Sequence, residues 1–143
     1  FNRTVTDMRE FLWPVRVYYE DTDSGGVVYY ANYLKFMERA RTECLRTMGF
    51  EQDKLRQEQG VLFAVHSLQV DFRRPALFND ALEVRAEIRS QRRASLTFFQ
   101  QIRRRGASDV LCCGHIRVAC VDAHSFKPVP IPECVRAELT NVC

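Results

Sequence analysis

The sequence contains no uninterrupted hydrophobic stretch long enough to cross a bilayer, and only 6 of its 143 residues are glycine and 5 are proline. These absences argue against a membrane-spanning helix, a collagen-like chain and a low-complexity segment. Internal repeats and linkers rich in glycine or serine are also absent. The composition that remains, with 46% hydrophobic and 27% charged residues, is typical of a single compact soluble domain.

Lysine is scarce as well. Of the 21 basic residues only Lys35, Lys54 and Lys127 are lysine, so arginine carries most of the positive charge. Arginine forms planar, bidentate hydrogen bonds with phosphate and carboxylate groups, and its excess suggests an anionic partner. RNA is one candidate, but 18 acidic residues are interspersed and no aromatic RNA-binding motif lies on a predicted strand. We therefore expect no nucleic-acid partner.

We expect no signal peptide at the start of this sequence. Asp7 and Glu10 interrupt the first residues before the hydrophobic segment of a signal peptide could form, so we expect a cytoplasmic protein. Five of the 6 cysteines follow residue 111, and a domain of this size needs no disulfide, which favours reduced thiols. Cys112-Cys113-Gly114-His115 comes closest to a metal motif, but neighbouring strand residues point to opposite faces and no second ligand pair follows at zinc-finger spacing. We expect no metal site.

Hydrophobic residues recur at helical spacing in the first third of the chain. The spacing predicts a helix over residues 33–48, with Asn32 as its N-cap and Gly49 at its end. Its opposite face is charged and is expected to meet solvent or another subunit. A short second helix or a turn is predicted over residues 52–59. The hydrophobic stripe of the long helix consists of Tyr33, Phe36, Met37, Ala40, Cys44 and Met48.

Alternating hydrophobic and polar residues predict the strands. The alternation slips by one residue near His66, which indicates a β-bulge. Short connections favour an antiparallel meander, and such a sheet must cover one face, for which the long helix is available. The prediction is an α+β fold with an antiparallel sheet wrapped around one central helix. The expected strands span residues 13–20, 61–72, 81–93, 95–105 and 110–121, and a short helix over 133–139 follows the extended segment 127–132.

The chemistry-bearing residues concentrate before the long helix. All 5 tyrosines lie between Tyr18 and Tyr33, in a window that also holds Asp21, Asp23 and two consecutive glycines. A turn that leads directly into a helix gathers backbone N–H groups in one place, which suits a carbonyl oxygen or an anion. A carboxylate beside such a site could attack an acyl carbon. The residue pattern alone also allows both aspartates to be simple turn formers.

The stretch from Tyr18 to Leu34 closely resembles the signature of acyl-CoA thioesterases of the 4-hydroxybenzoyl-CoA thioesterase superfamily. Among these it resembles the Tol-Pal-associated thioesterases of Gram-negative bacteria. The resemblance covers about residues 13–139. Besides this stretch it rests on Phe36, Glu38, Arg39-Ala40-Arg41, Val70-Asp71-Phe72, Pro75-Ala76, Asp80 to Leu82, Ser95-Leu96 and Cys120-Val121-Asp122.

The resemblance implies a hot-dog fold whose subunits pair edge to edge, with active sites at the dimer interface. It implies a single domain over residues 1–143, with an N-terminal extension over 1–12 and a C-terminal tail and helix over 127–143. In the relatives a carboxylate at the position of Asp23 is catalytic, and a main-chain N–H on or near Tyr30 binds the thioester carbonyl. The resemblance implies substrate binding by Tyr30 and by Ser95. Gly26 and Val28 are further substrate-binding candidates from the residue pattern, because glycine lets a substrate approach the main chain and valine excludes water.

The expected activity is hydrolysis of acyl-CoA to free acid and CoA without a cofactor. Asp23 would act either as a nucleophile or by activating water. Arginine pairs and triplets near strand ends are candidates for the CoA phosphates, although they could equally protect exposed strands. A homodimer or homotetramer is expected, and an acyl-carrier protein is a possible partner. The alternative is a non-catalytic hot-dog module that binds acyl-CoA or acyl-carrier protein.

Overall fold

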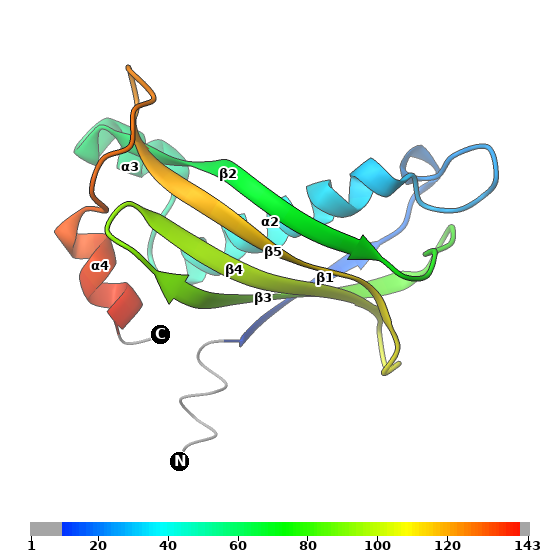
Figure 1. The fold of residues 1–143 in the computed structure, drawn as a ribbon. Helices are drawn as coiled ribbons and strands as arrows, with labels where there is room; N and C mark the ends of the chain where they lie inside the picture. The colour runs from blue at the N-terminus through cyan, green and yellow to red at the C-terminus, as the bar shows by residue number, and fades with distance from the viewer. Residues whose placement is uncertain (1–9, 141–143) are drawn as a thin grey trace, which may run out of the picture.

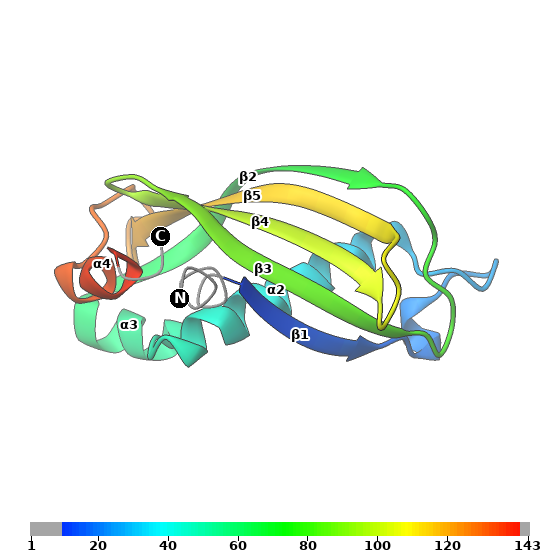
Figure 2. The same ribbon diagram turned by 90° about the horizontal axis from the view of Figure 1, so that it is seen from below.

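The computed structural model describes residues 10–140, and its sheet and helices form two layers. A five-stranded antiparallel sheet curves over the long helix α2, as Figures 1 and 2 show from two directions. No helix within the described residues is both long and apolar enough to span a membrane. The elements are β1 (Glu10–Arg16), a 3-10 turn η1 (Tyr19–Asp21), α2 (Tyr30–Thr47), α3 (Gln52–Gln59), β2 (Val61–Phe72), β3 (Ala81–Gln91), β4 (Ser95–Arg104), β5 (Val110–Asp122) and α4 (Glu133–Thr140).

The strand order in the sheet is β1-β3-β4-β5-β2. The predicted meander is therefore confirmed for β3, β4 and β5, whereas β2 and β1 occupy the two edges. β2 does not pair with the strand that follows it, because the segment after Phe72 crosses to the far side of the sheet before β3 begins. The predicted bulge is confirmed, since the register between β2 and β5 shifts between Val65 and Ser67.

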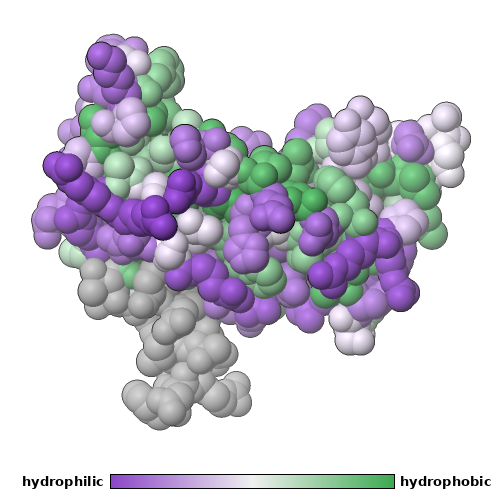
Figure 3. Space-filling model, viewed as in Figure 1, coloured by the Kyte–Doolittle hydropathy of each residue, from purple (hydrophilic) through white to green (hydrophobic). Residues whose placement is uncertain are grey.

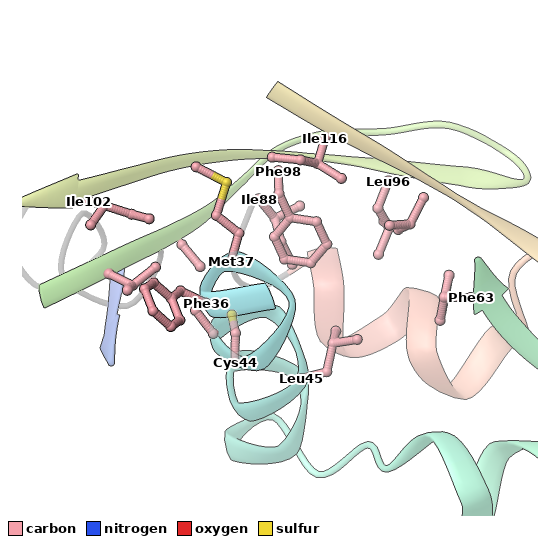
Figure 4. Packing of buried hydrophobic residues seen from close by; sticks show 14 of the residues in the cluster. Phe36, Met37, Cys44, Leu45, Phe63, Ile88, Leu96, Phe98, Ile102 and Ile116 are labelled. Atoms are coloured by element: carbon pink, nitrogen blue, oxygen red, sulfur yellow. The ribbon is translucent and has the colours of Figure 1, made fainter. Parts of the chain in front are cut away.

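The core lies between the sheet and α2. Phe36 and Met37 of the helix stripe are almost completely buried, and Figure 4 shows them packed under strand residues such as Phe98 and Ile102. Buried residues alternate with less buried ones along β4 and along the first half of β3, as expected for strands with one face on the core. Gln100 is the polar member of the β4 row and is fully buried, with its amide donating to the Met37 carbonyl at 3.0 Å.

The first strand is displaced from its predicted position. β1 begins at Glu10 rather than residue 13, so three residues of the predicted N-terminal extension belong to the sheet. It ends at Arg16 rather than residue 20, because residues 19–21 form a 3-10 turn in which Asp21 Oδ2 accepts the Tyr18 N–H at 2.9 Å. The alternation beyond Val17 therefore reflected a tight turn rather than a strand.

The helix α2 begins three residues earlier than predicted. Tyr29 is its N-cap, without a side-chain capping bond, and Asn32 lies within the first turn. The Asn32 side chain instead donates to the backbone carbonyl of Asp21 at 2.9 Å. The C-terminal end is close to the prediction, since the helix ends at Thr47 and Gly49 adopts φ +95°. Residues 52–59, predicted as a short helix or a turn, form the helix α3.

Candidate active site

A short loop between η1 and α2 carries the predicted catalytic aspartate. Its two limbs run antiparallel, with Thr22 bridged to Val28 and the Asp23 N–H donating to the Val27 carbonyl at 2.9 Å. Gly26 closes the turn at φ +82°, a backbone conformation that glycine adopts without strain. The second limb is tied to the segment after β2, because the Val28 N–H donates to the Ala76 carbonyl at 2.9 Å. The loop is therefore held at both limbs.

Asp23 projects from this loop into solvent. Its Oδ1 accepts the backbone N–H of Gly25 at 2.8 Å, and no bond to Oδ2 is found within the described residues. A Cβ at position 25 would lie 3.2 Å from Oδ1, so glycine permits the close approach of this backbone. One carboxylate oxygen is thus fixed by the main chain and the other is available for chemistry.

The N-terminus of α2 follows directly after the loop. Tyr30 is its first residue, and within the described part of the chain no group accepts the Tyr30 backbone N–H. This end is anchored to η1, since the Asp21 carbonyl accepts both the Tyr29 N–H at 3.0 Å and the Asn32 amide at 2.9 Å. The helix dipole adds a partial positive charge at the same point. A carbonyl oxygen that gains negative charge would be stabilised there.

A groove of about 230 Å³ opens beside this helix end. Aromatic rings form one wall, with Phe72 of β2 lying 5.9 Å from the Tyr30 ring and 5.7 Å from the Tyr33 ring between centroids. The Tyr33 hydroxyl is buried and accepts the Ala76 N–H at 2.8 Å, which fixes that wall. The groove is lined by Val28, Tyr30, Tyr33, Phe72, Arg73, Arg74 and Pro75. It offers an apolar channel with arginine side chains at its rim.

Four of the five predicted site residues come together and one does not. Val28 and Tyr30 line the groove, and Asp23 and Gly26 occupy the loop that leads to it. The Gly26 N–H already donates to the Asp23 carbonyl at 3.1 Å, so in this conformation it is not available to a substrate oxygen. Ser95 lies elsewhere, at the start of β4 beside α4, and Figures 1 and 2 place that end of the sheet opposite the loop.

Comparison with known proteins decides the family. Residues 17–139 match the family model described as the thioesterase-like superfamily. The chain belongs to this superfamily. It is 46% identical over 127 residues to "Acyl-CoA thioesterase YbgC" of Haemophilus influenzae, covering 89% of this chain and 92% of that protein.

Two further matches agree with this assignment. The chain is 47% identical over 128 residues to "Acyl-CoA thioester hydrolase YbgC" of Escherichia coli O6:H1, covering 90% and 94% of the two chains. Among solved structures, "Probable Thioesterase from Bartonella henselae" superposes with a TM-score of 0.81 at 32% identity, over 86% of this chain and 99% of that one. The α+β hot-dog fold predicted for this thioesterase-superfamily chain is confirmed.

The buried cysteines of β5 in this superfamily member are not available as nucleophiles. Burial raises the pKa of the Cys112 thiol to about 12 and that of Cys120 to about 11, so both stay protonated near neutral pH. His66 is exposed at the bulge of β2. No group of three potential metal ligands is found among residues 10–140.

Sequence reasoning missed how two residues contribute to this site. Asn32 was interpreted as a helix cap, but its side chain bonds to Asp21 and so anchors the loop to the helix. The side chain is buried, with 8% of its surface exposed, which is unusual for a cap and consistent with this role. Phe72 was predicted as the last residue of a strand, and its ring lies against the rings of Tyr30 and Tyr33 in α2. A hydrophobic residue that ends an alternating strand immediately before Arg73-Arg74 is the available sequence signal.

Proposed function

We propose that this protein is an acyl-CoA thioesterase that hydrolyses the thioester bond to release a carboxylic acid and CoA. The observation that carries the proposal is that one short loop presents two complementary groups. Asp23 offers a carboxylate oxygen without a hydrogen-bond partner, and Tyr30, where the loop enters α2, offers a backbone N–H without an acceptor among the described residues. The acyl-CoA activity named for relatives of 46% and 47% identity supports the same conclusion.

In the proposed reaction the thioester oxygen accepts the Tyr30 N–H, which stabilises the negative charge of the tetrahedral intermediate. The free Asp23 oxygen either attacks the carbonyl carbon, expelling CoA thiolate and forming a mixed anhydride that water then hydrolyses, or removes a proton from water as that water attacks. The proton lost by the nucleophilic water leaves on the CoA thiol or to solvent. Both routes require the same two groups.

Arg73 and Arg74 are the best-placed arginines for the phosphates of CoA. Both line the groove, and both of their backbone N–H groups donate to the Leu111 carbonyl, at 2.8 and 3.1 Å. The Arg74 guanidinium lies 3.6 Å from Asp109, whereas no carboxylate of the described residues lies within 4.0 Å of Arg73. Arg73 is therefore the arginine of this rim with its charge uncompensated by an ion pair.

The active unit in this proposal is a homodimer, which a homotetramer could contain twice. β2 is an edge strand, and its exposed hydrophobic residues Val65, Leu68 and Phe72 are 47–48% exposed. Figure 3 shows hydrophobic surface gathered where Figure 1 places β2. An unpaired hydrophobic edge is stabilised by pairing with an identical edge about a two-fold axis. Ser95 could approach a substrate only through such an assembly.

The cellular setting of the proposal rests on the sequence. We place the enzyme in the cytoplasm, with acyl-carrier protein as a possible second carrier of the acyl group, and in association with the Tol-Pal assembly of the cell envelope. A non-catalytic module that binds acyl-CoA is the alternative function. The free Asp23 oxygen favours catalysis, because binding alone would not need it.

The experiment that tests the proposal is Asp23→Asn. The amide keeps the size of the side chain and an oxygen that can accept the Gly25 N–H, so the fold is expected to survive. We expect thiol release from acyl-CoA to fall by at least about 100-fold while acyl-CoA still binds. Asp53→Asn, an exposed aspartate in α3, is the matched control. Undiminished turnover in Asp23→Asn would rule out the catalytic role, and a wild-type protein that binds acyl-CoA without turnover would favour the alternative function.

A further inference from the structure

A second cavity lies at the other end of α2, away from the Tyr30 groove. Its volume is about 190 Å³, and it opens between the C-terminal half of α2 and the first half of β2. Its floor consists of Leu45, Phe98 and Val118, each no more than 5% exposed, and Figure 4 shows Leu45 and Phe98 facing the space between helix and sheet. With about 30 Å³ for each water-sized group, the cavity holds about six such groups.

The polar wall of this cavity is formed by Arg41. Its Nη1 donates to Gln100 Oε1 at 3.0 Å, and Gln100 is held in turn by its own bond to the Met37 carbonyl. Gln52 cannot offer a further bond easily, because both of its amide atoms are engaged with the backbone of Phe63. Arg41 is therefore oriented by a buried amide rather than by a carboxylate.

The charge of Arg41 is not neutralised by an ion pair. No carboxylate of residues 10–140 lies within 4.0 Å of its guanidinium, although Glu38 lines the same cavity from an exposed position. Burial lowers the pKa of Arg41 and the charge of Glu38 opposes that shift, so the side chain keeps its positive charge. A guanidinium has five N–H groups, and the Gln100 bond uses one of them. The others can donate to a ligand oxygen in the cavity.

The dimer proposed above brings this cavity to the catalytic loop. If two β2 strands pair antiparallel about their middle, near the bulge, the first half of one strand lies beside the second half of the other. The first half, with Phe63 and Val65, lines the Arg41 cavity. The second half, with Phe72, lines the Tyr30 groove. The cavity of one subunit then continues the groove of its partner.

We infer that Arg41 selects, for the active site of the partner subunit, acyl groups of about five carbons that end in a carboxylate. The inference rests on the proposed thioesterase function and on the proposed dimer. The apolar floor accommodates the methylene chain, and the guanidinium donates to the terminal carboxylate. Glu38 repels that carboxylate only weakly, because its exposed charge is screened by solvent.

A matched pair of substrates tests the selection. Glutaryl-CoA and pentanoyl-CoA share a five-carbon chain and differ only in the terminal carboxylate. We expect the wild type to prefer glutaryl-CoA, and Arg41→Gln to lower kcat/KM for glutaryl-CoA by roughly 10- to 100-fold while changing pentanoyl-CoA by less than about threefold. Arg39→Gln, which removes the same charge from an exposed position of the same helix, should change neither substrate. Equal losses for both substrates, or no wild-type preference, would overturn the inference.

Mixing two variants that are each impaired in glutaryl-CoA hydrolysis tests whether Arg41 acts across the dimer. In a mixed dimer of Asp23→Asn and Arg41→Gln subunits, one site would combine the intact Asp23 of one chain with the intact Arg41 of the other. Glutaryl-CoA hydrolysis should then exceed the sum of the separate variants after the subunits are exchanged. If both residues act within one subunit, no rescue occurs and the placement across the dimer is wrong.

Two further measurements keep these outcomes separable. Should Arg41→Gln fail to fold, Arg41→Lys retains the charge without the planar fork and should show an intermediate loss for glutaryl-CoA alone. If the proposed thioesterase function is wrong, the result differs, because the wild type then hydrolyses neither glutaryl-CoA nor pentanoyl-CoA. Loss of both substrates in Asp23→Asn, with loss of one in Arg41→Gln, supports the two roles together.

Discussion

Cys112 and Cys113 are neighbours in β5, but the sheet gives their thiols opposite environments. Cys112 is completely buried, and burial raises its pKa to about 12, whereas Cys113 is half-buried on the outer face. Cysteine reactivity follows the exposed thiolate fraction. Cys112 and Cys113, which stand side by side in the sequence, are therefore expected to differ in reactivity.

We expect Cys113 and the exposed Cys134 to react with iodoacetamide at pH 8, while Cys112 and Cys120 react only after unfolding. Mass spectrometry of peptides from native and denatured protein checks this order. The raised pKa also has a consequence for stability. The Cys112 thiol stays protonated in the folded protein up to about pH 12, whereas a thiol in the unfolded chain ionises near pH 9. The free energy of unfolding therefore keeps its full value below pH 9 and falls as the pH rises towards 12. Rapid native labelling of Cys112 would contradict its burial.

At the scale of elements, the start of α2 depends on tertiary bonds rather than on a local cap. No side chain caps the helix at Tyr29, and the Asn32 amide instead binds the Asp21 carbonyl across the loop. Asn32→Asp removes this donor and sets a carboxylate beside a carbonyl at a site that is 8% exposed. We expect the free energy of unfolding to fall by about 1–3 kcal/mol and turnover to fall as well, because the loop that holds Asp23 loosens.

Denaturant unfolding of Asn32→Asp provides the measurement. Gln57→Glu makes the same amide-to-acid change at an exposed position of α3 and should stay within about 0.5 kcal/mol of wild type. Similar losses in the two variants would show that the Asn32 bond to the loop carries no special weight.

The same element shows what the sequence could predict and what it could not. Periodicity located the strands, the bulge at His66 and the buried stripe of α2. It could do so because hydrophobic residues recur along the chain at the spacing of the buried face of a strand or helix. It misplaced the end of β1, because the residues beyond Val17 form a local 3-10 turn closed by Asp21. It misplaced the start of α2, because the deciding bond there joins the Asn32 side chain to the Asp21 carbonyl across the loop. The proximity of Phe72 to Tyr30 is long-range in the same way and lies outside the reach of a local pattern.

At the scale of the whole molecule, the two edges of the sheet differ in what they expose. Leu68 on β2 and Leu12 on β1 are similarly exposed, at 47% and 43%. β2 carries two further exposed hydrophobic residues, Val65 and Phe72, so it is the edge we expect to pair.

Leu68→Lys should convert the dimer to monomers in sedimentation velocity and lower the activity, because the groove and the Arg41 cavity then separate. Leu12→Lys adds the same charge at the other edge and should leave both properties unchanged. Dissociation by Leu12→Lys but not by Leu68→Lys would place the interface at β1. A wild-type monomer at micromolar concentration would contradict the dimer itself.

The pairing of β2 with β5 also has a consequence during synthesis. Val61 of β2 pairs with Asp122 of β5, so β2 leaves the ribosome well before its partner strand exists. At about 5–20 residues per second, the roughly 50 residues between the ends of the two strands take about 2–10 s to appear. For that interval both edges of β2 lack their partners, and on a polysome neighbouring nascent chains present the same strand. The hydrophobic edge that suits subunit pairing is therefore also the segment most exposed to premature association.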